Sequence, residues 1–94
     1  MRNPQETARI FKVLSVETRV RILQLLKQQV LCVGALASRL DISSAAVSQH
    51  LRVLREADLV EPEKRGYYVH YRINHDTLEE WRRIADRLLS ADES

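Results

Sequence analysis

The sequence predicts a mainly α-helical domain that carries one small β-hairpin. Two observations lead to this fold class. Hydrophobic residues make up 45% of the chain and recur at helical spacing in several segments, and the chain holds only two glycines and two prolines. Between residues 59 and 73 the pattern changes to the alternation that is typical of strands. We expect the 94 residues to form a single domain, residues 1–94.

Two short helices joined by a tight turn are predicted between residues 36 and 54. Asp41 ends the first helix, because Asp tolerates the left-handed backbone conformation that such a turn needs. Ser43 can cap the second helix by accepting a hydrogen bond from a backbone N–H two or three residues further on. This arrangement is a helix-turn-helix signature. The predicted inward stripes are Leu36, Ala37 and Leu40 on the first helix and Val47, Leu51 and Leu54 on the second.

The outward face of the second helix is suited to reading DNA. It combines small side chains with amide, hydroxyl and guanidinium groups and contains no acidic residue, which allows a close approach to base edges in the major groove. A solvated polar face without any nucleic-acid role is the alternative, and the helical pair alone does not decide between the two. His50, beside the apolar stripe, can contact a phosphate or a base, or simply pack at the helix edge. The predicted DNA-contacting residues of this helix are Ser44, Ala45, Ser48, Gln49, His50 and Arg52.

A β-hairpin is predicted directly after this helix. Its strands cover residues 59–63 and 67–73, and Lys64, Arg65 and Gly66 join them. Gly66 permits the positive φ that a hairpin often requires, and the proline in the first strand predicts an edge position. A basic hairpin tip that follows a recognition helix indicates a winged helix. We expect Lys64 and Arg65 to reach phosphates or the minor groove beside the helix.

Over nearly its whole length the chain resembles the ArsR family of bacterial and archaeal winged-helix repressors. Residues 14–26 (LSVETRVRILQLL) look like the family's second helix, residues 47–60 (VSQHLRVLREADLV) look like its recognition helix and wing entry, and residues 66–73 look like the returning wing strand. Asp41 and Asp58 depart from the pattern, since members commonly carry glycine there in a turn. The resemblance implies a winged helix-turn-helix with five helices and a two-stranded wing. It also implies a transcriptional repressor of its own operon that binds double-stranded DNA.

The two ends of the chain are predicted to form a homodimer. Asn74 can cap a C-terminal helix with an apolar stripe, a second stripe lies near the N-terminus, and in the ArsR family the terminal helices pair across a two-fold axis. Both stripes could instead pack on their own domain, but a stripe containing Trp81 on so small a domain favours a partner surface. A two-fold dimer predicts an imperfectly palindromic operator. The predicted interface residues are Phe11, Leu14, Leu78, Trp81, Ala85 and Leu88.

Composition and charge exclude several classes of protein. No apolar run approaches the roughly 20 residues of a membrane span, and the N-terminus lacks the pattern of a signal peptide, so we expect a cytoplasmic protein without membrane contact. The net charge is only +2, so DNA binding depends on the two acid-free stretches, residues 43–55 and 64–74. No phosphate-binding loop, nucleophile–base set or clustered metal ligands occur in the sequence, and we therefore expect no enzymatic activity.

Whether Cys32 has a sensing role is a separate question. Metal-sensing ArsR members use a Cys-x-Cys pair, or carboxylates and histidines on the C-terminal helix. Here Gly34 holds the second thiolate position and no histidine follows His75. A soft ion needs about three or four donors, so we expect no metal site and no cofactor, with Cys32 a small, partly buried residue. A thiol- or metal-responsive repressor using Cys32, and a winged-helix module that docks a protein instead of DNA, remain the alternatives. The inducer, whether a small molecule or a redox signal, is not predicted.

Overall fold

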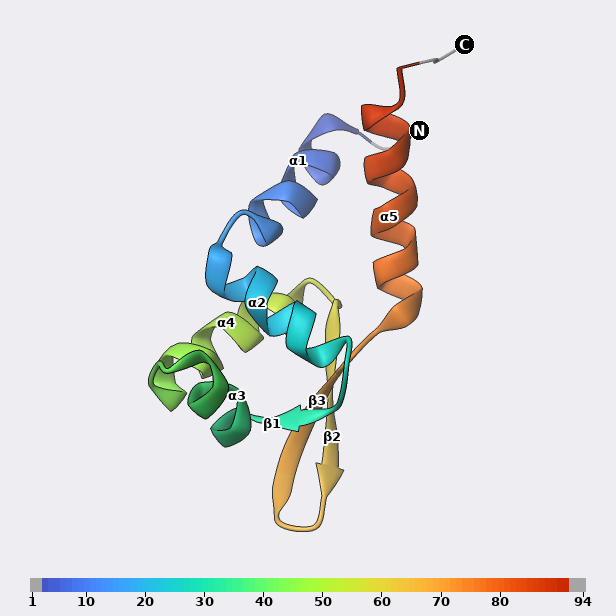
Figure 1. The fold of residues 1–94 in the computed structure, drawn as a ribbon. Helices are drawn as coiled ribbons and strands as arrows, with labels where there is room; N and C mark the ends of the chain where they lie inside the picture. The colour runs from blue at the N-terminus through green and yellow to red at the C-terminus, as the bar shows by residue number, and fades with distance from the viewer. Residues whose placement is uncertain (1–2, 92–94) are drawn as a thin grey trace.

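The computed structural model describes residues 3–91, and this part of the chain contains five helices and one three-stranded antiparallel sheet (Figure 1). The predicted fold class is confirmed, with one strand more than expected. In chain order the elements are α1 (Pro4–Leu14), α2 (Glu17–Leu26), β1 (Leu31–Cys32), α3 (Val33–Leu40), α4 (Ser44–Glu56), β2 (Val60–Arg65), β3 (Tyr68–Ile73) and α5 (His75–Leu89).

Side-chain caps define where three of the helices begin. The Oδ1 atom of Asn3 accepts a hydrogen bond from the backbone N–H of Glu6 at the start of α1, at 2.9 Å. Ser43 and Asn74 cap α4 and α5 in the predicted way, because their side-chain oxygens accept from backbone N–H groups three residues further on. Each cap satisfies a donor that has no partner inside its helix.

Two aspartates adopt the left-handed conformation in turns. Asp41 ends α3 with φ 57° and ψ 47°, as predicted for the turn between α3 and α4. Asp58 has φ 63° and leads from α4 into β2, where its Oδ2 atom also accepts a hydrogen bond from the Thr77 hydroxyl of α5. The two positions at which the family commonly has glycine therefore have the backbone that glycine favours.

The core lies between α2, α3, α4 and the sheet. Both predicted stripes of the helical pair are buried, and the side chains of Leu36, Val47 and Leu54 have no exposed surface. They pack with Ile22 of α2 and with Ile73 of β3. This packing fixes the orientation of α4, because rotating the helix would bring its apolar stripe into water.

The sheet has the strand order β1-β3-β2, and β1 was not predicted. Leu31 and Cys32 of β1 pair with Tyr71 and His70 of β3. On the other side of β3, the edge strand β2 contains Pro62, as its predicted edge position requires.

The tip of the hairpin differs from the prediction by two residues. Strand β2 continues through Lys64 and Arg65, so both residues are paired with β3 and do not form the turn. The turn is the two-residue segment Gly66–Tyr67, with Gly66 at φ +62°. The basic side chains therefore flank the tip, and an aromatic residue occupies it.

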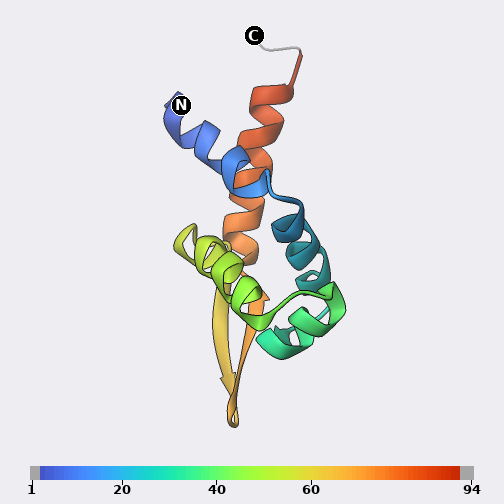
Figure 2. The same ribbon diagram turned by 90° about the vertical axis from the view of Figure 1, so that its left-hand side faces the viewer.

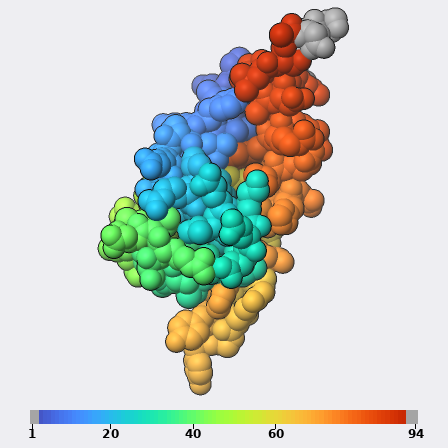
Figure 3. Space-filling view, viewed as in Figure 1, coloured from blue at the N-terminus to red at the C-terminus, as the bar shows by residue number. Residues whose placement is uncertain are grey.

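The wing projects from the rest of the molecule at the end opposite to α1 and α5 (Figures 1 and 3). The described chain is elongated, with principal extents of 51 × 23 × 21 Å. The buried part of the wing is its base, where Val60 and Ile73 enter the core. The alternation of a half-buried strand groups Val69 with Tyr71 and Ile73 and predicts that it is covered, but Val69 is 43% exposed because the outer half of the wing extends beyond the helices.

Candidate nucleic-acid interface

The outward face of α4 is presented to solvent as predicted. Ser44, Ala45, Ser48, Gln49 and Arg52 are exposed, and His50 is half-buried at the edge of the apolar stripe. The face lies on the surface of the molecule, and α4 runs in front of the sheet in the view of Figure 2. An exposed helix of 13 residues with small side chains in its first turns has the dimensions and the chemistry of a major-groove reader.

Arg52 has an acidic partner one helical turn away. Its Nε atom lies 3.3 Å from Oε2 of Glu56, and the two side chains are 80% and 64% exposed. An exposed i,i+4 pair of this kind contributes only about 0.3–0.5 kcal/mol. A phosphate or a guanine edge can therefore replace Glu56 as the partner of Arg52 at little cost.

The basic residues of the wing differ in whether they have a carboxylate partner. Lys64 makes no ion pair within the described part of the chain, whereas Nε of Arg65 lies 2.7 Å from Oε2 of Glu63. Arg72 lies 3.1 Å from Glu61 and 3.6 Å from Glu63. The hydrogen bond from Arg65 is the largest cause that lowers the pKa of Glu63 below its ordinary value.

These partners could not be seen in the sequence, where residues 64–74 form an acid-free stretch. The acids lie just before that stretch in the sequence, and strand pairing brings them back to it. Glu61 is the register partner of Arg72, and Glu63 lies two residues from Arg65 on the same face of the sheet.

Tyr67 is a candidate contact residue that sequence analysis did not select. It is 100% exposed at the tip of the wing, and its neighbour Tyr68 is 66% exposed. The two aromatic residues beside Gly66 were the available signal, but the alternation of residues 67–73 placed them in a half-buried strand. A fully exposed aromatic side chain on a projecting hairpin has little to contact on its own domain.

The predicted dimer residues lie on α1 and α5, and they differ in how far their own chain covers them. Leu14, Leu78 and Trp81 pack partly against the core of their own domain. For these three residues, the alternative that the stripes cover their own domain therefore holds in part. Phe11 and Ala85 are half-buried, and Leu88 is 56% exposed. Of the α5 residues, all of which the structure describes, Thr77 alone is buried. Most of the apolar stripe of α5 is thus only partly covered by its own chain.

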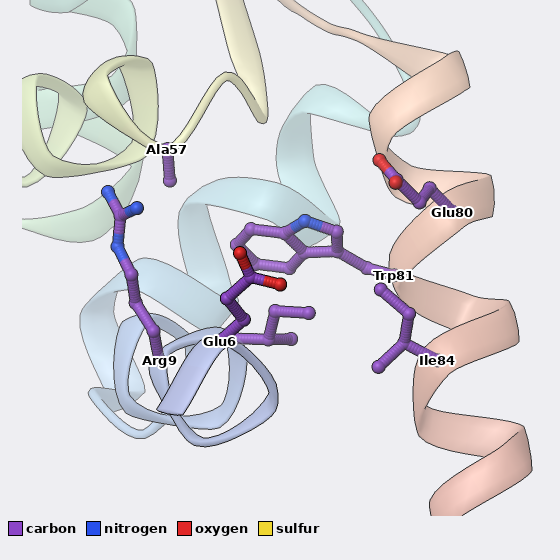
Figure 4. A pocket seen from close by; sticks show the side chains of 7 residues that line it. Glu6, Arg9, Ala57, Glu80, Trp81 and Ile84 are labelled. Carbon is purple, nitrogen blue, oxygen red and sulfur yellow. The ribbon is translucent and has the colours of Figure 1, made fainter. Parts of the chain in front are cut away.

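A half-open cavity of about 180 Å³ lies between α1, α5 and the end of α4. The indole ring of Trp81 reaches from α5 toward α1, and Glu6 and Arg9 extend from α1 beside it (Figure 4). Ala57, which ends α4, forms another part of the wall. The cavity therefore belongs to the same partly covered α1–α5 surface as the predicted dimer residues.

Cys32 is half-buried and stands at the N-cap of α3, where its thiol makes no capping hydrogen bond. Within residues 3–91 no group of three or more His, Cys, Asp and Glu side chains is arranged to hold a metal ion. His75 is exposed at the start of α5. None of the described helices is long and apolar enough to span a membrane.

Comparison with known proteins identifies the family. The model of the bacterial regulatory proteins of the arsR family matches residues 17–62. The transcriptional repressor SdpR of Bacillus subtilis is 32% identical over 71 residues, covering 76% of this chain and 79% of that protein. The transcriptional repressor SmtB homolog of Synechocystis is 37% identical over 90 residues, covering 94% of this chain and 67% of that protein.

A solved structure agrees over nearly the whole chain. The solution structure of a homodimeric winged helix-turn-helix DNA-binding domain from Mycobacterium bovis, a possible ArsR-family transcriptional regulator, has a TM-score of 0.73 and 29% sequence identity. The match covers 96% of this chain and 87% of that chain. With the fold, the helix-turn-helix pair and these relatives in agreement, the chain belongs to the ArsR family of DNA-binding transcriptional regulators.

Proposed function

We propose that this protein is a transcriptional repressor that binds an imperfectly palindromic operator as a homodimer in the cytoplasm. The observation that carries the proposal is the exposed polar face of α4, whose one acidic residue, Glu56, lies in the last turn, and which a buried stripe holds in place beside a projecting wing. Relatives described as repressors support the direction of regulation, and the homodimeric solution structure supports the assembly. Two reading helices related by a two-fold axis match two half-sites about one helical turn apart.

The contacts divide into those that specify a sequence and those that position the protein. Gln49 presents an amide that can bond both N6 and N7 of adenine, and Ser48 and Ala45 allow the close approach that this contact needs. We assign Lys64 and Arg65, with Ser44 at the start of α4, to contacts with the DNA backbone. Arg52 can serve either role, and His50 lies at the edge of the contact. The dimer contacts are those of the α1–α5 surface: Phe11, Leu14, Leu78, Trp81, Ala85 and Leu88.

A protection assay on the DNA upstream of the protein's own gene tests the function directly. We expect a protected, two-fold-symmetric site and a steep fall in affinity as the salt concentration rises. A reporter gene behind this site should be silenced by the protein. Absence of any protected palindrome there or elsewhere in the genome, or activation of the reporter, would contradict repression.

Replacing Gln49 with Ala is expected to reduce discrimination among operator sequences. A bidentate amide contact contributes about 1–3 kcal/mol against the wrong base, so the variant should lose most of its preference at one position of each half-site. Titration of a set of single-base operator variants measures this loss. Equal weakening on every sequence would show that Gln49 does not read a base.

The matched control for this variant is Lys64→Ala. Lys64 has no ion pair within the described residues, so its ammonium group is free to meet a phosphate. The substitution should weaken operator and random DNA by the same factor and lower the salt slope by about one.

Arsenite, cadmium and zinc are expected not to release the protein from DNA. Each subunit carries one cysteine, and a single thiolate does not supply the donors that these ions require. At position 34 an added Cβ atom would meet no heavy atom within 4 Å, so Gly34→Cys should fold normally and raise the affinity for cadmium. DNA release across a metal series is the measurement, with Cys32→Ser as the control. Metal-dependent release by the wild type that disappears in Cys32→Ser would make Cys32 part of a sensor.

A further inference from the structure

The outer face of the wing carries a row of alternating charges. Counted from the base to the tip, cross-strand partners on this face are Glu61 with Arg72, Glu63 with His70, and Arg65 with Tyr68. Glu63 lies at the centre of the row. One of its oxygens is 2.7 Å from Nε of Arg65, and the other is 3.6 Å from Nε of Arg72.

A carboxylate and a backbone phosphate are competing ligands for a guanidinium group. Both accept charge-assisted hydrogen bonds from its N–H donors, so a donor and a share of the positive charge engaged by one are less available to the other. The side chains of Glu63 and Arg65 are 32% and 53% exposed, which leaves the pair accessible to an approaching phosphate. Glu63 therefore engages the Nε donor of Arg65 and lies beside that of Arg72, two groups through which the wing would meet DNA.

We propose that Glu63 restrains DNA binding, because its carboxylate holds Arg65 and Arg72 and competes with backbone phosphates for their guanidinium groups. The proposal rests on the proposed DNA-binding function and adds a residue that opposes it. Lys64 lies on the opposite face of β2 without such a partner, so the wing retains one unrestrained cation. The restraint is expected to act on DNA of any sequence, since it weakens contacts between the arginines and backbone phosphates, which are the same in every sequence.

Substituting Glu63 with Gln is the direct test. The amide keeps the size of the side chain and removes the charge, so it weakens the hold on Arg65, while Arg72 keeps its second carboxylate partner, Glu61. We expect affinity for operator and random duplexes to rise about three- to tenfold, and the slope of log affinity against log salt to become steeper by about one. Fluorescence anisotropy at several salt concentrations gives both quantities.

Loss of a negative charge near DNA would by itself raise affinity, and a double-mutant cycle separates that effect from release of Arg65. In the Arg65→Ala background, Glu63→Gln should give less than half of its gain, because the more closely held of the two arginines is no longer there. A further control is Glu79→Gln on α5, which is not part of the wing. Glu79 pairs with Arg82 and Arg83 in the same way, and its substitution should leave DNA affinity unchanged.

Each outcome bears on the proposal. A Glu63→Gln protein that binds DNA no better than wild type, or a gain that persists in full in the Arg65→Ala background, overturns the restraint while leaving the DNA-binding function in place. Failure of the wild-type protein to bind any duplex overturns the proposed function and the restraint together. Thermal melts of all variants, expected to agree within a few degrees, show that the fold is unchanged, because exposed ion pairs contribute little to stability.

Discussion

The Leu88→Asp protein is expected to be a monomer that binds the palindromic operator at least about 100-fold more weakly than wild type. Leu88 is 56% exposed in the single chain, so the fold of one subunit does not depend on it. In the proposed dimer the same side chain is covered, and an unpaired carboxylate at that place costs several kcal/mol. In a dimer, binding of one subunit to its half-site holds the second subunit at a high effective concentration near the other half-site. Separated subunits lose this advantage, and each must bind its half-site independently.

Sedimentation velocity and operator titration together measure this result. The matched control is Arg83→Gln, which makes the same change in net charge on the polar side of α5, where Arg83 pairs with Glu79. The control should remain a dimer with unchanged operator affinity. If Leu88→Asp stays dimeric at the same concentrations, the α1–α5 surface is not where the subunits meet.

Much of the helical part of the fold could be predicted because its determinants are local in the sequence. The stripes of α3 and α4 follow from spacing alone, since a helix places residues three and four apart on one face. Ser43 and Asn74 were recognisable as caps because each accepts from a backbone group only three residues away. The outward face of α4 followed from the same argument, because it is the side of the helix opposite to the buried stripe.

Strand β1 could not be predicted, because it forms only by pairing with β3, which lies far away in the sequence. Two residues are too few for a periodic pattern, and Leu31 and Cys32 are strand residues only because β3, nearly forty positions later, pairs with them. The tip of the wing was misplaced for a related reason. Gly66 signals a turn, but which residues flank it depends on the register of the two strands, which is determined by burial of Val60 and Ile73 at the base.

The charge of the wing shows why placement in sequence is a poor guide to electrostatics in a sheet. Residues 64–74 contain no acid, yet Arg65 and Arg72 both lie within 4 Å of carboxylates from β2. Antiparallel pairing returns the second strand along the first, so residues eleven apart, such as Glu61 and Arg72, become direct neighbours. A count of charges along the chain therefore overstated the positive field of the wing.

Replacing Leu54 with Ala is expected to lower the free energy of unfolding by about 2–5 kcal/mol. Its side chain has no exposed surface and lies in the last turn of α4, where the helix passes to Asp58 and β2. Truncation removes buried apolar area and leaves a cavity at the point where α4, the wing and the core meet. Since small domains are stable by only about 5–15 kcal/mol, this is a large part of the total.

Urea titration followed by circular dichroism, at one fixed protein concentration because the protein is proposed to dimerise, measures the loss. Arg55→Ala is the matched control, because Arg55 is the next residue of the same helix and is exposed, so its truncation should change stability by less than about 0.5 kcal/mol. The DNA affinity of Leu54→Ala should fall at elevated temperature in proportion to the fraction of protein that is unfolded. The outward face of α4 can read a groove only while Leu54 and its stripe hold the helix against the core. A midpoint shift no larger than that of Arg55→Ala would show that α4 is held mainly by its other contacts, and the orientation argued for Gln49 would then lose its physical basis.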